Sequence, residues 1–259
     1  MAPTPVSYPK PYEAVVLDIE GTTTPITFVH QVLFPYILEH AQFFLETHWD
    51  DSTCQNYLAG LAKQNTEDIQ QGLTDIPTIV NLTDPAIPKA KKIKTVVANI
   101  RYQMQQDRKI KALKDFQGYM WKDGYYSGDL KATVYEDVID ALRTWHERGV
   151  PVYIYSSGSV PAQKLLFGYS DHGDLTHYLH GYYDTSVGSK LAPESYQVIA
   201  GNIGREPANV LFVSDNPKEI QAAEATGMQV VISLRPGNAL IADDVLQRYL
   251  TITSFASLL

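Results

Sequence analysis

The chain has 259 residues, of which 44% are hydrophobic and 19% charged, and its formal net charge is −8. This composition excludes global disorder and favours one large domain or a core domain with a smaller one. The negative charge argues against general nucleic-acid binding.

The single cysteine and the lack of a secretory signal pattern indicate a reducing compartment. Cys54 is the only cysteine, so no internal disulfide can form, and no nearby His or basic residue favours a nucleophilic thiolate there. No apolar run approaches the roughly 20 residues of a membrane helix. Residues 1–11 predict a short disordered lead-in, without the apolar core of a secretory signal. We therefore expect a cytoplasmic protein, with a nuclear location as the alternative, and no membrane partner.

The first element that the sequence predicts is a buried strand at residues 14–17, an apolar run with β-branched residues that ends abruptly at Asp18. Between residues 28 and 117 apolar residues recur at helical spacing, and no strand pattern appears. Residues 72–88 contain three prolines and predict a loop within this stretch. The whole stretch is therefore predicted to be a helical insertion.

After Gly128 the pattern changes to strands that alternate with helices. Strands are predicted at residues 150–155, 210–213 and 230–234, and helices at residues 134–145, 163–167, 193–203 and 217–226. Such alternation predicts an α/β fold with a mostly parallel sheet covered by helices. We predict a core domain made of residues 1–27 and 129–259, and a helical domain made of residues 28–128.

Polar or acidic residues follow three of the predicted strands directly. Asp18 follows the first strand, Ser156 and Ser157 follow the second, and Asp215 comes just after the strand at 210–213. In an open α/β sheet, ligands bind at the carboxyl ends of the strands, so these residues can converge although they are far apart in the sequence.

The two aspartates predict a metal site and a nucleophile. Carboxylate oxygens of Asp18 and Asp215, completed by water, suit Mg²⁺. The metal would screen the charge of a phosphate and let a carboxylate approach it. Aspartate is a known nucleophile toward phosphoryl groups, which makes Asp18 the candidate. Glu20 can reach back to the same site, protonate a leaving oxygen and later activate water.

Hydroxyls and a lysine supply the candidate phosphate site. The side chains and backbone N–H groups of Ser156 and Ser157 lie at a strand-to-helix turn, which is typical of anion sites. Lys190 precedes the helix predicted at 193–203 and can neutralise phosphate charge. Each of these features is common on its own in loops and caps. Their conjunction, in this order and at strand ends or helix starts, predicts a magnesium-dependent phosphatase.

These motifs resemble those of haloacid-dehalogenase-superfamily hydrolases, and most of all the enolase-phosphatases. The resemblance rests on Asp18-Ile19-Glu20-Gly21-Thr22-Thr23, Ser156-Ser157, Lys190 and Ser214-Asp215-Asn216-Pro217, with the longer runs 152–160 and 163–168. It covers nearly the whole chain from Val15 to Met228. It implies a Rossmann-like core with a helical cap inserted after the first motif, one Mg²⁺ per subunit, and a role in methionine salvage.

By the same resemblance, the substrate is a phosphorylated diketone that carries a methylthio group, which is enolised and then dephosphorylated to acireductone. Asp18 would be nucleophile and metal ligand, and Glu20 would be acid/base and would also touch the metal. Ser156 and Ser157 would hold phosphate, Lys190 would balance charge, and Asp215 would bind metal. Glu20 departs from the wider superfamily, where Asp is usual at this position, so the wider pattern does not fix its acid/base geometry.

Other functions are also compatible with these residues. A phosphatase for another small phosphomonoester, such as a sugar phosphate, would use the same fold. A non-catalytic binding module on this fold would be expected to lack a carboxylate or the lysine, yet the sequence has Asp18, Glu20, Lys190 and Asp215. A metal-independent haloacid dehalogenase would not need the second aspartate, Asp215. The proton of enolisation could be taken by His30, Arg101 or Tyr102. We expect the protein to be a monomer.

The positive charge of the chain is concentrated in the predicted helical domain. Residues 89–122 hold ten Lys or Arg against two Asp, a local net charge of +8. This stretch either steers an anionic substrate or forms a solvated helix face, and the second interpretation is the more economical one.

Overall fold

A computed structural model of the chain describes residues 10–259, so most of the predicted lead-in lies outside the described residues. The chain divides into two compact units. The core unit comprises the described residues up to His30 together with Leu130–Leu259, and the helical unit comprises Gln31–Asp129. That the helical unit acts as a cap stays a prediction.

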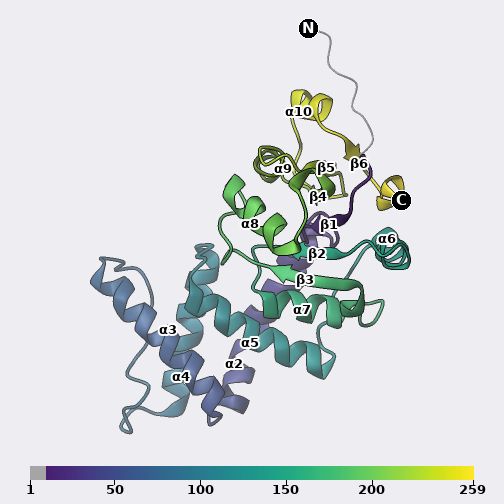
Figure 1. Cartoon of the computed structure of the whole chain (residues 1–259). Helices are drawn as coiled ribbons and strands as arrows, with labels where there is room; N and C mark the ends of the chain where they lie inside the picture. Colours follow the sequence, from purple (N-terminus) through teal and green to yellow (C-terminus); the bar gives the residue numbers. More distant parts are fainter. Residues whose placement is uncertain (1–9) are drawn as a thin grey trace. The chain divides into compact units, whose positions relative to one another are not determined.

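The core unit is built on a six-stranded sheet (Figure 1). Its strands are β1 (Ala14–Leu17), β2 (Val152–Tyr155), β3 (Leu179–Tyr183), β4 (Val210–Ser214), β5 (Gln229–Ser233) and β6 (Thr251–Ile252). They lie in the order β3-β2-β1-β4-β5-β6, and all pairs are parallel. The predicted α/β class with a parallel sheet is confirmed.

Helices cover both faces of the sheet, which explains why β1 and β4 are wholly buried. The helices of this unit are α6 (Glu136–Glu147), α7 (Val160–Gly168), α8 (Pro193–Ile203), α9 (Pro217–Glu224) and α10 (Asp243–Arg248). Tyr196 of α8 and Ile220 of α9 pack with Val16 and Phe212 in one buried cluster. Val15 and Leu17 alternate to the opposite face.

Two of the six strands have no clear signal in the sequence. The edge strand β3 has the sequence Leu-His-Gly-Tyr-Tyr and is only partly buried, so it lacks the apolar run of an interior strand. The other edge strand, β6, is only two residues long. Edge strands need fewer apolar residues because one side of each pairs with no other strand.

The helical unit consists of α2 (Phe34–His48), α3 (Ser52–Gln70), α4 (Lys89–Gln105) and α5 (Lys111–Ser127), and no strand occurs between Gln31 and Asp129, as predicted. The chain enters it through α1 (Ile26–Phe28) and the π-helical turn η1 (Val29–Leu33). Most of the basic residues between 89 and 122 are exposed, so they form a solvated surface of α4 and α5.

The predicted loop at residues 72–88 is irregular but held at its centre. Asn65 of α3 and Asn99 of α4 both donate to the carbonyl of Pro77, at 3.1 and 2.9 Å. The side-chain oxygen of Asn65 also accepts from the N–H of Ile79 at 2.8 Å. These buried amides satisfy backbone groups that the loop cannot pair with itself.

A second buried polar contact closes the helical unit. Asp68 is 2% exposed and receives two hydrogen bonds from the Arg108 guanidinium, which lowers the pKa of the carboxyl although burial opposes this. Replacing Arg108 by Ala should destabilise the protein by about 3–5 kcal/mol at neutral pH, because Asp68 would be buried without its partner.

The test is urea unfolding of Arg108→Ala beside Lys111→Ala, which removes an exposed ion pair with Asp115. Because the folded-state pKa of Asp68 is lowered, the stability that it contributes is present above its unfolded pKa and is lost as pH falls through the folded pKa. The difference between wild type and Arg108→Ala should therefore shrink in acid. Equal losses in the two variants would contradict this interpretation.

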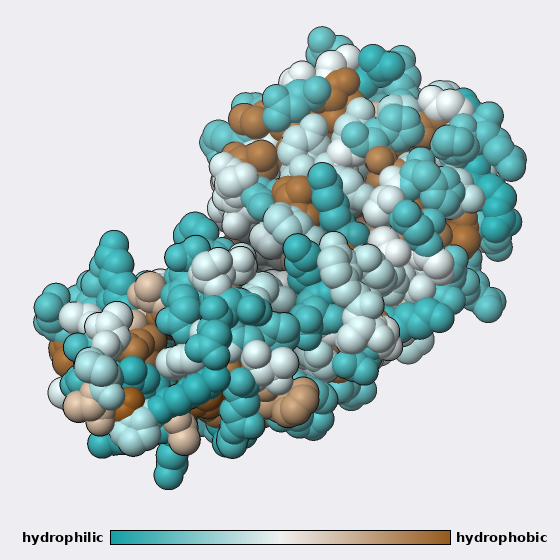
Figure 2. Space-filling model, turned by 90° about the horizontal axis from the view of Figure 1, so that it is seen from below, coloured by the Kyte–Doolittle hydropathy of each residue, from teal (hydrophilic) through white to brown (hydrophobic). Residues whose placement is uncertain are grey.

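None of the helices between residues 10 and 259 is both long and apolar enough to cross a membrane. On the face shown in Figure 2, hydrophobic residues form small separate groups among hydrophilic ones.

Candidate active site

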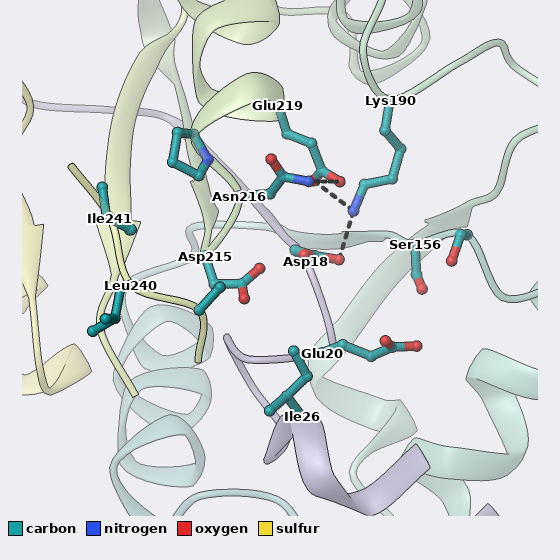
Figure 3. A pocket seen from close by; sticks show the side chains of 13 residues that line it. Asp18, Glu20, Ile26, Ser156, Lys190, Asp215, Asn216, Glu219, Leu240 and Ile241 are labelled. Atoms are coloured by element: carbon teal, nitrogen blue, oxygen red, sulfur yellow. Dashed lines mark hydrogen bonds and ion pairs between the residues drawn. The ribbon is translucent and has the colours of Figure 1, made fainter. Parts of the chain in front are cut away.

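A pocket of about 370 Å³ lies in the core unit at the carboxyl ends of β1, β2 and β4 (Figure 3). Because β1 lies between β2 and β4, the ends of these strands are neighbours. All six residues that the sequence predicted line the pocket: Asp18, Glu20, Ser156, Ser157, Lys190 and Asp215. The structure thus brings them together, while their chemical roles stay predictions.

Asp18 lies at the centre of the pocket and is 5% exposed. Its Oδ1 accepts from the N–H of Ile19 at 2.8 Å and from Lys190 Nζ at 2.6 Å. Its Oδ2 lies 3.2 Å from the hydroxyl of Ser214. These contacts fix the orientation of the carboxylate in the pocket, as the role of a nucleophile requires.

Lys190 is 9% exposed and lies between two carboxylates. Its Nζ is 2.6 Å from Asp18 Oδ1 and 2.6 Å from Glu219 Oε2. Burial alone would lower the pKa of the ammonium, but the two carboxylates outweigh burial and raise it. The backbone is also held, because the Tyr196 hydroxyl donates to the Lys190 carbonyl at 2.7 Å. Lys190 is therefore a fixed positive charge beside Asp18.

Glu219 is a member of this site that the sequence did not reveal. It lies in the first turn of α9, where an acidic residue is common for reasons of the helix dipole alone. Burial and then the charge of Asp18 raise its pKa to about 7, and Lys190 opposes both. The Ser214 hydroxyl lies 3.0 Å from Glu219 Oε2, so its single proton can go either to Glu219 or to Asp18.

Asp215 is packed against the turn that follows Asp18. Gly21 in this turn has φ +69°, and a Cβ there would lie 2.7 Å from the Asp215 carboxyl carbon. Only glycine allows both this backbone conformation and this approach. Burial and then the charge of Asp18 raise the pKa of Asp215 to about 7. The carboxylates of this pocket therefore repel one another.

The charge of the pocket fits a hard cation. One lysine, Lys190, and four acidic residues line the pocket, so its net charge is 1 − 4 = −3 when all are ionised. The acidic residues are Asp18, Glu20, Asp215 and Glu219. The raised pKa of Asp215 and of Glu219 makes this charge less negative near neutral pH. The donors are all oxygens, which suits Mg²⁺. No three His, Cys, Asp or Glu side chains among residues 10–259 form a cage for a metal. Mg²⁺ usually binds one or two carboxylates and keeps several of its water ligands. Two aspartates, one backbone oxygen and water would therefore suffice here.

Ser156 and Ser157 line the pocket at the end of β2, just before α7. The turn is ordered by internal contacts: the Ser156 hydroxyl accepts from the N–H of Gly158 at 3.2 Å, and Gln163 donates to the Gly158 carbonyl at 2.7 Å. These contacts hold the turn open toward the pocket, where its polar groups can meet an anion.

The residues considered for enolisation do not line this pocket. His30 ends the core unit, whereas Arg101 and Tyr102 lie on α4 of the helical unit. Arg101 donates to the carbonyl of Leu38 at 3.3 Å. Any part of theirs in proton transfer stays a prediction.

The loop after β5 is a second part of the site that sequence reasoning missed. Ala239, Leu240 and Ile241 line the pocket. Asn238 donates to the Gly21 carbonyl at 2.9 Å and so connects this loop to the turn after Asp18. The Arg-Pro-Gly-Asn run at 235–238 signals a turn in the sequence but does not reveal what the turn approaches.

Comparisons with known proteins agree with this arrangement. The family model for haloacid dehalogenase-like hydrolases matches residues 12–227. "Enolase-phosphatase E1" of Xenopus tropicalis is 48% identical over 96% of this chain and 95% of that protein. The protein of the same name from Danio rerio is 43% identical over 98% and 97%. The crystal structure of the UTR4 protein from Saccharomyces cerevisiae matches with a TM-score of 0.73 and 36% identity, over 94% of this chain and 98% of that one.

Proposed function

Because this chain belongs to the enolase-phosphatase E1 family of haloacid dehalogenase-like hydrolases, we propose that it acts on 5-methylthio-2,3-dioxopentyl phosphate in methionine salvage. It would enolise this substrate and release phosphate to give acireductone. The observation that carries the proposal is the buried Asp18–Lys190–Glu219 chain beside Asp215, at the ends of adjacent strands.

The positions of the carboxylates support the following proposal for the phosphatase half of the reaction. An oxygen of Asp18 attacks phosphorus while the bond from phosphorus to the leaving oxygen breaks, and Glu20 gives that oxygen a proton. Glu20 then takes a proton from water, whose oxygen attacks phosphorus and releases phosphate from Asp18. Hydrogen bonds from the Ile19 N–H and from Lys190 hold Asp18 in one orientation before substrate binds.

The substrate phosphate needs compensating charge. A phosphate dianion would be repelled by the carboxylates that line this pocket. The proposed function therefore needs one Mg²⁺ per subunit, which the side chains of Asp18 and Asp215 and the backbone carbonyl of Glu20 would hold. Bound Mg²⁺ would neutralise phosphate charge and polarise its oxygens. Ser156, Ser157 and Lys190 would hold the remaining phosphate oxygens. We also propose a cytoplasmic monomer, without nucleic-acid or membrane partners.

The test is phosphate release from the methylthio diketone phosphate and from a panel of sugar phosphates, with Mg²⁺ and with EDTA. Magnesium-dependent release confined to the diketone, with the absorbance of an enol, is the expected result. Release from sugar phosphates alone would move the function to another small phosphomonoester. Release that is equally fast in EDTA would remove the metal, and with it the proposed role of Asp215, from the mechanism. The shared pocket would serve either alternative, so only this panel separates them.

Replacing Gly21 by Ala should raise the Mg²⁺ concentration needed for half-maximal phosphate release by roughly ten-fold or more, because the new Cβ displaces the Asp215 carboxylate. The positive φ adds a stability loss of about 1–3 kcal/mol. The control is Gly201→Ala on α8, where a Cβ meets nothing and helix propensity improves. An unchanged metal titration in Gly21→Ala would count against Asp215 as a ligand.

A further inference from the structure

One wall of the pocket is apolar. It consists of Ile26, Ala239, Leu240 and Ile241, which we call the apolar lip. The side chain of Leu240 is fully exposed, at 101% of its reference area. A single exposed leucine is common on a protein surface, but this one lines the cavity that holds Asp18, together with three other apolar residues.

The lip is held in place by hydrogen bonds from its loop. Asn238 donates to the carbonyls of Gly21 and Ser233, at 2.9 and 3.3 Å. At the start of the loop, Arg235 donates to the Thr22 carbonyl at 3.3 Å and to Asp137 at 2.9 Å. The loop is therefore attached, two residues before Leu240, to the turn that follows Asp18.

Charge and polarity are segregated across the pocket. In Figure 3, Leu240 and Ile241 lie on one side of Asp215, while Asp18, Lys190 and Ser156 lie on the other. A ligand whose phosphate meets Asp18 and Ser156 would extend its other end toward the lip. The side chains of the lip offer no hydrogen-bonding group, so a hydroxyl-rich sugar placed there would lose its hydrogen bonds to water.

We propose that the apolar lip, with Leu240 as its main contact, binds the apolar end of the substrate and selects against polar phosphomonoesters. This inference deepens the proposed function and rests on it. The methylthio end of the diketone would cover Leu240, and removing both surfaces from water would favour the longer substrate.

The experiment compares kcat/KM for the methylthio diketone phosphate with that for 2,3-dioxobutyl phosphate, which lacks the methylthiomethyl end. Wild type should prefer the longer substrate. Leu240→Ser should lower kcat/KM for the longer substrate by roughly ten-fold and for the shorter one much less, so the preference shrinks. Leu240→Met, which restores an apolar side chain of similar length, should recover most of the preference. Val198→Ser, an exposed apolar residue on α8 outside the pocket, is the matched control.

Failure of this inference differs from failure of the proposed function. If wild type hydrolyses the diketone phosphates but Leu240→Ser keeps the wild-type preference, the lip does not select the substrate although the function stands. Equal losses on both substrates, or the same loss in Val198→Ser, would likewise overturn it. If wild type releases phosphate from neither compound, the proposed function fails and this inference fails with it.

Discussion

Replacing Asp18 by Asn should abolish phosphate release while the fold remains intact. The amide keeps the shape of the carboxylate but cannot attack phosphorus, so covalent catalysis is lost and a fall of at least about four orders of magnitude is expected. The N–H of Ile19 can still donate to the remaining oxygen. Stopped-time phosphate assays give the rate, and acid quenching of a reaction with ³²P-labelled substrate detects the aspartyl-phosphate.

The control for this variant is Asp140→Asn, which changes an exposed carboxylate of the same unit on α6. It should leave both the rate and the labelled intermediate unchanged. Thermal unfolding of Asp18→Asn shows whether the fold survives, because loss of the charge also removes one of the two partners of Lys190. A folded Asp18→Asn variant that retains substantial activity, or that still traps labelled phosphate, would refute Asp18 as the nucleophile.

The sequence predicted the part of this site that follows directly from strand ends. Asp18, Ser156 and Asp215 each come at or just after the end of a buried run, and parallel strands place such residues along one edge. The interior strands β1 and β4 were predicted for the same reason, because burial on both faces leaves a continuous apolar signature. These signals are local, so the sequence alone can carry them.

Contacts that depend on the third dimension left no such signature. Glu219 lies in the first turn of α9, whereas Lys190 precedes α8. Nothing in their spacing along the sequence predicts that Lys190 Nζ lies 2.6 Å from Glu219 Oε2. Leu240 looks like an ordinary loop residue until the loop is attached to Gly21 through Asn238. The edge strands β3 and β6 were missed because the partial burial of one and the shortness of the other remove the apolar period.

Replacing Lys190 by Ala should lower kcat/KM by roughly two to three orders of magnitude, which corresponds to roughly 3–4 kcal/mol of transition-state stabilisation. The ammonium is the only positive charge among the residues that line the pocket, which the transferring phosphate shares with four acidic residues. Steady-state kinetics across a range of Mg²⁺ concentrations would separate this loss from weaker metal binding. Lys218→Ala, which removes an exposed lysine at the start of α9, is the matched control.

A loss in Lys190→Ala has two physical sources, which a second variant separates. Removing the lysine leaves Asp18 and Glu219 buried without their partner, which should cost about 3–5 kcal/mol of stability. Adding Glu219→Gln to Lys190→Ala removes one of these charges, so the double variant should regain stability but not activity. If it regains most of the activity as well, Lys190 serves mainly to neutralise Glu219. If it stays inactive although stable, the ammonium is needed beside Asp18, where it holds the nucleophile and meets the phosphate, as the 2.6 Å contact between Lys190 and Asp18 predicts.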